Sequence, residues 1–409
     1  MPLHEQAKAE DPSFKTPEEI AAEEHTEAAP AVAAHQAGKA PWWQRWVPHT
    51  KKMRIIAGVI AVVLAFGIGA TWTLTHHKRA VVADTTPKKV VTKPKPTLYS
   101  MLTGMPIADA SLNQKPVTAV MVENSVDARP QSGLLDAGIV YEAVAEGGVT
   151  RFMALYQDTA PANVGPIRSA RPYYIQWAMG YDAAYAHVGG SPDALSDITA
   201  WGVKDLNQFS NGNSYHRISS RPAPHNVYTG IDTLNQLETA KGYGASTYTG
   251  FARKSDQPYK TPAATTGKKS ASADTRTPAT GISMSLSGYT YDPHFDYDAA
   301  TNSYNRSEAG KPHVDAESGK QLSPKVVVAI VVPMSQGALD SSGAYYSDYN
   351  TIGSGQAFIF QDGTVTTATW NKPSNDASLT LTDARGAAVP LNRGQTWITA
   401  ITAPNKVSY

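Results

Sequence analysis

The chain of 409 residues contains no cysteine. This absence excludes disulfide bonds, thiolate zinc sites, a cysteine nucleophile and a lipid attached through an N-terminal lipobox cysteine. A charge surplus is also missing, because 36 Lys and Arg residues face 35 Asp and Glu residues and leave a net charge of +1. Such a chain has no overall field that attracts nucleic acid, and we expect no nucleic-acid partner.

Signatures of cofactor chemistry are missing too. The sequence has no G-x-G-x-x-G fingerprint, no Walker loop and no H-E-x-x-H pair. It therefore gives no support for dinucleotide redox chemistry, nucleotide hydrolysis or zinc proteolysis. The histidines lack the spacing of metal ligands, and we expect neither a metal nor another cofactor. These patterns assign no catalytic residue.

The longest apolar run predicts a membrane segment. No charged residue lies between Ile55 and Leu74, and a helix of that length, at about 1.5 Å per residue, spans the roughly 30 Å hydrocarbon core of a bilayer. The stretch before it is far longer than the leader of a cleaved secretory signal. We expect one transmembrane helix over 55–75, between a disordered tail over 1–54 and an extended stalk over 76–97.

The orientation of this predicted span does not follow from nearby charges, because basic residues flank it equally on both sides. A signal-anchor keeps a short N-terminal tail inside and translocates the long C-terminal part. We therefore place the N-terminus in the cytoplasm and the rest of the chain outside the cell membrane, in the cell envelope.

Residues 98–250 predict an α/β domain. Apolar runs bounded by Gly, Pro, Asp or Asn indicate buried strands at Val117–Glu123, Gly138–Ala145, Arg151–Gln157 and Ala183–Val188. Helices are expected over 172–179, 192–201 and 230–237, the first beginning with a proline and the second capped by Ser191. Strands that alternate with helices are typical of α/β domains.

The remainder of the chain predicts a different architecture. Residues 251–282 are rich in Lys, Ser, Thr, Ala and Pro and indicate a low-complexity linker. Residues 283–409 contain short alternating or β-branched runs and predict a mainly antiparallel all-β domain. Asp362-Gly363 is the strongest hairpin signal, because Gly tolerates the positive φ of a type I′ turn. We expect the polar residues of Asp292–Asp315 on the surface of a hairpin.

Charged residues gather at the predicted strand ends, where loops leave a sheet and ligands usually bind. Arg168, Ser169 and Arg171 stand directly before a predicted helix. A guanidinium fork and free N-terminal amides both favour oxyanions. In the structural alternative, the two arginines form salt bridges with Glu142 and Glu146.

Six further residues complete the predicted ligand-binding set: Arg129, Arg151, His187, Ser191, His225 and Asn226. His187 and His225 could act together as a proton-transfer pair or contribute to a metal site. Ser191 follows a predicted strand, but its neighbours do not match the G-x-S-x-G elbow of a serine nucleophile. An N-cap is the stronger interpretation of this serine.

Several separated motifs occur in the order found in one known family. They include Arg129-Pro130-Gln131-Ser132-Gly133, Glu146-Gly147-Gly148-Val149-Thr150-Arg151, Gly165-Pro166-Ile167-Arg168-Ser169-Ala170-Arg171-Pro172, His187-Val188-Gly189-Gly190-Ser191 and Pro224-His225-Asn226-Val227-Tyr228. Through them most of residues 98–405 resembles the YerB-like family of bacterial envelope lipoproteins, a domain-of-unknown-function family. The resemblance implies two domains and an extracytoplasmic location, and it leaves the activity open. Family members are typically tethered by a lipidated cysteine, which this sequence lacks.

Two hypotheses of function result. The first is a non-catalytic envelope protein whose Arg, Glu and His side chains bind an anionic cell-wall polymer or a wall-synthesis protein. The second is an enzyme acting on glycan or lipid-linked pyrophosphate precursors, because the order of features is similar to that of the LytR-CpsA-Psr wall-polymer ligases. In the second hypothesis Glu142 or Glu146 holds magnesium or acts as a base, and the arginines clamp the pyrophosphate.

Overall fold

The computed structural model describes residues 97–260, 274–340 and 343–409. The predicted tail and transmembrane helix, and the stalk up to residue 96, lie outside the described residues. Among the helices of the described part, none is both long and apolar enough to cross a membrane. The described residues all belong to one compact unit, Lys93–Tyr409.

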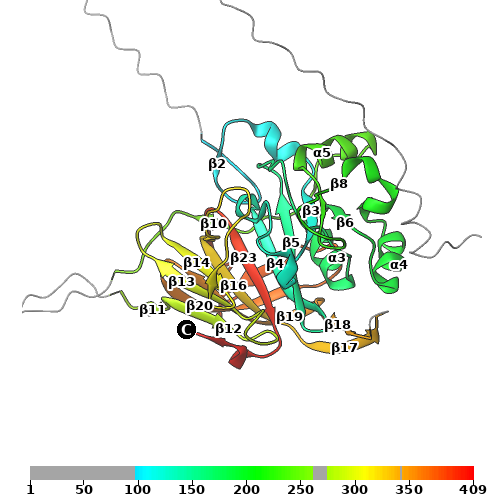
Figure 1. The fold of residues 1–409 in the computed structure, drawn as a ribbon. Helices are drawn as coiled ribbons and strands as arrows, with labels where there is room; N and C mark the ends of the chain where they lie inside the picture. Colours follow the sequence, from blue (N-terminus) through cyan, green and yellow to red (C-terminus); the bar gives the residue numbers. More distant parts are fainter. Residues whose placement is uncertain (1–96, 261–273, 341–342) are drawn as a thin grey trace, which may run out of the picture. The chain divides into compact units, whose positions relative to one another are not determined.

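A large mixed β-sheet forms the centre of this unit (Figure 1). Its main path in the described residues is, in order, β11 (Thr277–Pro278), β20 (Thr364–Lys372), β19 (Gly353–Gln361), β16 (Val326–Val331), β23 (Thr396–Ile401), β4 (Ile139–Glu146), β5 (Val149–Tyr156), β3 (Thr118–Glu123), β6 (Ala184–His187) and β7 (Lys204–Asn207). Joined to it off this path are β17 (Met334–Leu339), β18 (Tyr345–Tyr349) and β21 (Thr380–Thr382).

Two groups of three parallel strands in this sheet run in the same direction. Strands β16, β23 and β4 are parallel neighbours, as are β3, β6 and β7, and antiparallel β5 joins the two groups. Their carboxyl ends therefore meet along one edge, which we call the C-edge of the sheet.

The other elements cover the large sheet. The α-helices are α3 (Pro172–Met179), α4 (Pro192–Ala200) and α5 (Ile231–Ala240). A smaller sheet, in the order β15 (Lys311–Pro312), β14 (Ser303–Glu308), β13 (Pro293–Asp298), β12 (Gly281–Met284) and β24 (Val407–Ser408), is entirely antiparallel. Short strand pairs are β1 (Leu98–Tyr99) with β2 (Pro106–Ile107), β8 (His216–Arg217) with β9 (Val227–Tyr228), and β10 (Arg253–Lys254) with β22 (Leu391–Asn392).

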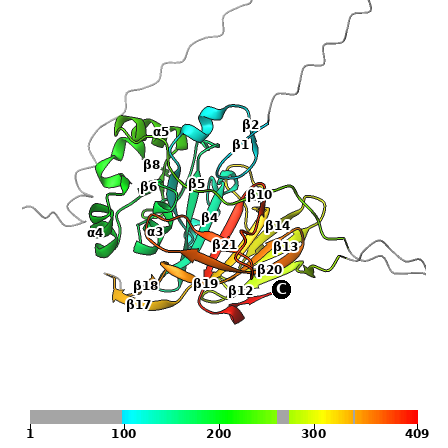
Figure 2. The same ribbon diagram turned by 180° about the vertical axis from the view of Figure 1, so that it is seen from behind.

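The two faces of the large sheet bury two hydrophobic clusters. On one face, Tyr174 and Trp177 of α3 and Ile198 of α4 join Tyr141 and Met153 of the sheet. The other cluster combines sheet residues with side chains of α5 and of the smaller sheet. In both ribbon views the helices and the strands β12 to β14 lie toward opposite ends of the large sheet, to either side of β4 and β5 (Figures 1 and 2).

Local sequence explains why these elements begin and end where they do. Helix α3 begins with a proline, and Ser191 caps α4 by accepting a hydrogen bond from the backbone N–H of Ala194 at 3.4 Å. The hairpin prediction is confirmed, because Asp362 and Gly363 have φ of 59° and 72° and join β19 directly to β20. These features place the strand ends that carry the predicted site.

The sheet continues across the boundary that the sequence suggests. Strand β4 of the α/β part lies beside β23 of the β-rich part, with Ile139 paired to Thr396. The expected linker contributes β10 and β11 to paired strands. The β-rich part departs from an antiparallel arrangement where β16 runs parallel to β23. Composition did not reveal that the two parts share one sheet, because strand partners distant in sequence leave no local pattern.

Candidate functional site

Most of the predicted site residues lie along the C-edge. Strands β3, β4 and β6 end there at Glu123, Glu146 and His187. Strand β5 begins at the same edge, where Arg151 is the cross-strand partner of Glu123. Segment 165–170 forms bridges with β3 and with the residues that follow β6. After β3 the chain continues to β4 on one side, and after β6 it continues to β7 on the other side, which makes this the kind of position at which α/β sheets usually bind ligands.

The carboxylate of Glu123 is the centre of a group that we call the Arg168 site, formed by Glu123, Ser125, Arg168 and His225. Its Oε1 atom accepts a hydrogen bond from Ser125 Oγ at 2.9 Å and lies 2.9 Å from His225 Nδ1. Arg168 Nε lies 3.3 Å from the same oxygen. The side chain of Glu123 is 4% exposed and that of Arg168 is 25% exposed.

The Arg168 site has unused hydrogen-bonding capacity. In the described part of the chain, neither Arg168 Nε nor Glu123 Oε2 has a hydrogen-bond partner. The salt bridge to Glu123 holds the guanidinium at the C-edge without occupying its terminal N–H groups. An oxyanion that approached from solvent could accept hydrogen bonds from them.

The Arg168 site does not have the geometry of a serine hydrolase. In the catalytic arrangement the imidazole stands between hydroxyl and carboxylate and uses one ring nitrogen for each. Here Ser125 Oγ, at 3.3 Å, and Glu123 both approach Nδ1 of His225, and the hydroxyl also donates to the carboxylate. The hydroxyl and the carboxylate therefore share one ring nitrogen, unlike the two partners of a catalytic histidine.

Glu146 is the centre of a second group, which adjoins the first. Its Oε2 accepts a hydrogen bond from Arg171 Nη2 at 2.6 Å, and its Oε1 accepts one from Arg151 Nη2. The guanidinium of Arg171 lies over the ring of Tyr346, 4.7 Å from its centroid. Burial and the neighbouring Arg171 lower the pKa of Arg151 to about 10. The alternative in which the two arginines form salt bridges with Glu142 and Glu146 is thus correct for Arg171, which pairs with Glu146. Glu142 is not the partner of either arginine.

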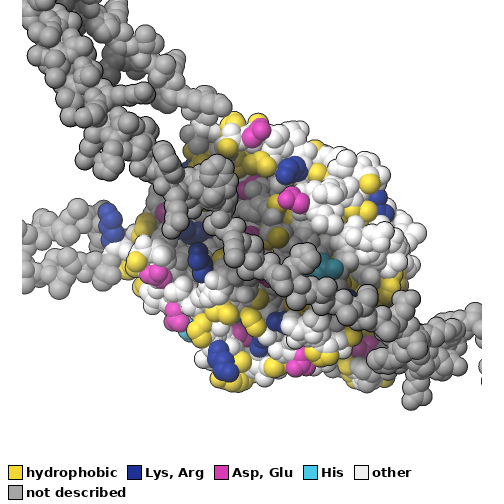
Figure 3. Space-filling view, turned by 45° about the horizontal axis from the view of Figure 1, so that its top comes forward, with side chains coloured by type: hydrophobic (Ala, Val, Ile, Leu, Met, Phe, Trp, Pro, Cys, Tyr) yellow, Lys and Arg dark blue, Asp and Glu magenta, His cyan; other side chains and the backbone are white. Residues whose placement is uncertain are grey.

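The two groups together carry a positive surplus. Arg151, Arg168 and Arg171 supply three positive charges, and Glu123 and Glu146 supply two negative charges, which leaves one positive charge before His225 is counted. Elsewhere, on the face drawn in Figure 3, basic and acidic side chains are interspersed.

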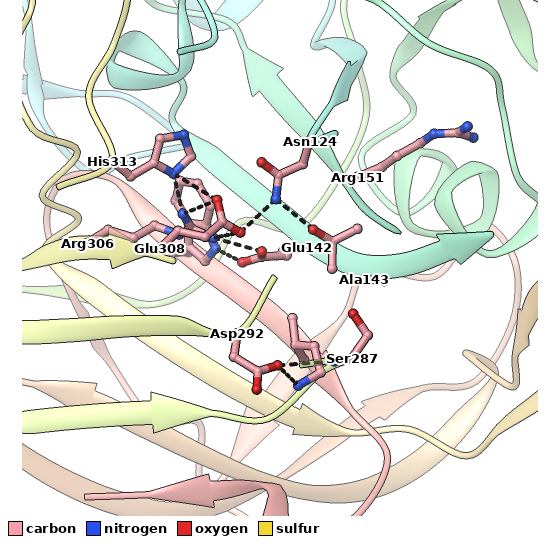
Figure 4. A network of polar contacts seen from close by, with 12 residues as sticks. Asn124, Glu142, Ala143, Arg151, Ser287, Asp292, Arg306, Glu308 and His313 are labelled. Atoms are coloured by element: carbon pink, nitrogen blue, oxygen red, sulfur yellow. Dashed lines mark hydrogen bonds and ion pairs between the residues drawn. The ribbon is translucent and has the colours of Figure 1, made fainter. Parts of the chain in front are cut away.

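Glu142 belongs to a third group, which is completely buried (Figure 4). Its Oε1 accepts a hydrogen bond from Arg306 Nη2 and its Oε2 accepts one from Trp397 Nε1, each at 2.8 Å. Arg306 also forms a salt bridge with Glu308 at 3.3 Å and donates to His313 Nδ1. Figure 4 shows Arg151 directed away from this cluster.

Arg129 extends the buried group toward the surface. Its Nη2 lies 3.3 Å from Glu308 Oε1, and its Nε donates to Asn124 Oδ1 at 3.0 Å. Burial raises the pKa of Glu142 to about 7, although the adjacent guanidinium of Arg306 opposes the shift. Burial and Arg306 also hold the pKa of His313 well below its usual value, so its neutral ring can accept from Arg306.

Sequence reasoning placed the residues of this buried group wrongly. Arg306 and His313 were expected on a hairpin surface, yet they are 0% and 5% exposed. Polar residues in a turn-rich segment give no sign that a distant carboxylate will cover them. Because Glu142 is buried and both of its oxygens are occupied, it is not positioned to act as a base on a solvent-borne substrate.

The remaining predicted residues have separate structural partners. Buried His187 contacts the carbonyl of Gly189 at 2.7 Å and Asp205 Oδ1 at 2.9 Å, whereas His225 contacts Glu123, so the two histidines do not form a pair. Asn226 Oδ1 accepts a hydrogen bond from Arg217 at 2.6 Å. Within the described ranges, no three His, Asp or Glu side chains are arranged to hold a metal ion.

Two residues of the Arg168 site escaped sequence reasoning. Glu123 was interpreted only as the end of a strand, and Ser125 was not considered. The available signal was the sequence at the end of β3, where the carboxylate of Glu123 and the hydroxyl of Ser125 come just after an apolar run. A polar group at the carboxyl end of a central strand is a general indication of a binding position.

Known proteins resemble the chain over most of its length. Two family models match it, "Protein of unknown function (DUF3048) N-terminal domain" over residues 102–244 and the corresponding C-terminal domain over 282–398. The chain is 30% identical to "Putative lipoprotein YerB" of Bacillus subtilis over 305 residues, which are 74% of this chain and 86% of the relative.

The crystal structure of YerB from Bacillus subtilis has the same fold. It matches with a TM-score of 0.64 and 28% identity, and the match covers 76% of this chain and 99% of the solved chain. The two domain models and the length of the sequence match agree with this likeness. The chain belongs to the DUF3048 family, a family of proteins of unknown function.

Proposed function

We propose that the protein is a membrane-attached component of the bacterial cell envelope that binds an anionic cell-wall polymer at the Arg168 site. The observation that supports the proposal is the guanidinium of Arg168, which is 25% exposed and forms its salt bridge with Glu123 through Nε and not through its terminal N–H groups. A repeating phosphate or carboxylate group supplies the oxygens that such a fork prefers.

The proposed location is supported by the relative and by the sequence. The Bacillus relative carries the name of a lipoprotein, which describes a membrane-attached protein. This sequence contains no cysteine for such a lipid, but it has the uncharged run from Ile55 to Leu74. We propose that this run serves as the tether, with the N-terminus in the cytoplasm and the DUF3048 region outside.

Binding is favoured over catalysis because the candidate bases are already occupied. Glu142 is fully buried against Arg306 and Trp397. Glu146 accepts hydrogen bonds from two arginines, and Ser125 donates to Glu123. A group that recognises charge needs no free base, whereas a hydrolase or transferase needs one within reach of the proton to be moved.

The test uses the full-length protein in detergent and isolated bacterial walls. Sedimentation is measured with walls that retain their anionic polymers and with walls from which these polymers have been chemically removed. Retention is expected only with the intact walls. Arg168→Ala is expected to weaken it about tenfold or more, because a hydrogen bond to a charged group contributes about 1.5–3 kcal/mol.

Arg385→Ala is the matched control, because that arginine is 88% exposed and its guanidinium pairs, among the described residues, with Asp383 alone. It is expected to sediment as the unaltered protein does. Equal retention of Arg168→Ala and the unaltered protein would refute the site. Turnover of a lipid-linked pyrophosphate by the unaltered protein in the presence of magnesium would instead favour the enzyme hypothesis.

A further inference from the structure

A cavity of about 370 Å³ opens on the smaller sheet, outside the Arg168 site. Small-molecule sites commonly have volumes of about 300–1,000 Å³. The cavity is lined by strands β12, β13, β14 and β24 and by the turn that contains Tyr289. Neither the sequence motifs nor the proposed anion site uses any of these side chains.

A row of polar side chains crosses the sheet at this cavity. In the strand register Ser408 is opposite Ser283, Ser283 is opposite His294, and His294 is opposite Ser307. Their neighbours along the strands, among them Ile282 and Phe295, are buried. Because side chains alternate between the faces of a sheet, the row is presented on the outer face.

The row offers several hydrogen-bonding groups at short spacing. His294 Nδ1 lies 2.8 Å from Ser283 Oγ, and His294 Nε2 lies 3.1 Å from Asp296 Oδ1. Each serine hydroxyl can donate one hydrogen bond and accept others. Such groups match a ligand that carries many hydroxyls of its own.

An aromatic wall completes the cavity. Tyr289 lines the cavity, and its side chain is 74% exposed and therefore open to a ligand from solvent. Its hydroxyl lies against Gly310, which has a φ of +69° and where a Cβ would collide with the phenol oxygen. Because Gly310 has no Cβ, it leaves room for the hydroxyl end of the Tyr289 side chain.

We propose that this cavity binds a saccharide segment. A pyranose ring has an apolar C–H face that can pack on the ring of Tyr289, while its hydroxyls exchange hydrogen bonds with Ser283, Ser307 and Ser408. The inference does not rest on the anion site. Hydrolysis is not part of it, because the carboxylate of Asp296 is 66% exposed and is not held by a buried environment as a relay carboxylate is.

The test is calorimetric titration of the full-length protein with the tetrasaccharide of β-1,4-linked N-acetylglucosamine, in a detergent without a sugar head group. Tyr289→Ala is expected to weaken binding about tenfold or more through loss of the ring contact. Tyr289→Phe, which keeps the ring, is expected to bind nearly as well as the unaltered protein. Tyr345→Ala removes a tyrosine that is 50% exposed on β18 and serves as the control.

The outcomes separate this site from the anion site. Arg168→Ala is expected to bind the tetrasaccharide normally, even if it no longer binds walls. The proposal is overturned if the unaltered protein does not bind the tetrasaccharide, or if Tyr289→Ala binds it as tightly. Cleavage of the tetrasaccharide that disappears in His294→Ala would also overturn it, in favour of a hydrolytic site.

Discussion

Arg306 donates a hydrogen bond from Nη2 to Oε1 of Glu142 across 2.8 Å, although the two residues are 164 positions apart in the chain. Both side chains are completely buried. The guanidinium also lies 4.8 Å from the ring of Trp397, so it is enclosed by an aromatic surface as well as by carboxylates. This contact fastens β14 of the smaller sheet to β4 at the centre of the large sheet.

Arg306→Met is therefore expected to destabilise the protein severely. It leaves Glu142 without its buried counter-charge and leaves Glu308 with Arg129 alone, and removal of one partner of a buried ion pair typically costs about 3–5 kcal/mol. The free energy of unfolding is measured by urea titration of the full-length protein. Arg385→Met, at an exposed site, is the control and is expected to change little.

A double substitution separates charge from packing at this contact. Glu142→Leu combined with Arg306→Met removes both charges together, and buried ion pairs replaced by apolar groups often lose little stability. The double variant is expected to be more stable than Arg306→Met alone. If the two are equally unstable, the loss comes from packing around Arg306 and not from stranded carboxylates.

The two family domains are expected to depend on each other for folding. A fragment of residues 97–250 lacks β23, the neighbour of β4, and a fragment of residues 274–409 exposes the edge of β23 that β4 covers. Each fragment also lacks one side of the Arg306 network. Neither should show the cooperative thermal unfolding expected of residues 97–409. Sharp, separate transitions for the two fragments would disprove this dependence.

Local pattern was sufficient to predict the elements but not their partners. Apolar runs with flanking turn residues located β3, β4, β5 and β6 to within two residues at each end, and Asp362-Gly363 located a hairpin. Each of these features depends on neighbours in sequence. The parallel contact of β4 with β23 depends on residues more than 250 positions apart, and nothing in either run specifies the other.

The candidate site shows the same division. Arg168 and His225 were proposed from the chemistry of their segments, and the structure brings both to the carboxylate of Glu123. Glu142 was proposed on equal grounds, but Arg306 covers it from a distant strand. The sequence identified residues whose chemistry suits a binding site. Only the folded arrangement shows that Arg168 is partly exposed and that Glu142 is buried.

Glu238 should make stability decrease as the pH rises toward neutrality. Its side chain is buried on α5, where Oε1 accepts a hydrogen bond from Thr118 at 2.7 Å and Oε2 has no partner in the described part of the chain. Burial raises its pKa from 4.5 to about 7. Between these values the folded state binds the extra proton, so this group's stabilisation is complete below pH 4.5 and is lost as the pH passes about 7.

The effect is measured as the difference in unfolding free energy between the unaltered protein and Glu238→Gln. The amide keeps an oxygen for Thr118 and does not titrate. The difference is expected to change by up to about 1.4 kcal/mol per pH unit within the window. A difference that stays constant from pH 4.5 to 7 would contradict the assignment.

Lys372 should have the opposite effect at alkaline pH. Its buried ammonium donates hydrogen bonds to the carbonyl oxygens of Asn375 and Ala377 at 2.8 and 2.7 Å, and no carboxylate in the described ranges forms a salt bridge with it. Burial lowers its pKa from 10.5 to about 8. Between these values the unfolded chain binds more protons than the folded chain, so stability increases with pH across this window.

Lys372→Met removes this titration while keeping most of the apolar side chain. The unaltered protein is expected to gain stability relative to the variant by up to about 1.4 kcal/mol per pH unit as the pH rises through the window. Tyrosines that ionise in the same range are common to both proteins, so their contribution cancels in the comparison. Parallel pH profiles for the two proteins would show that the amine of Lys372 keeps its ordinary pKa when buried, stabilised as a cation by the two carbonyl oxygens.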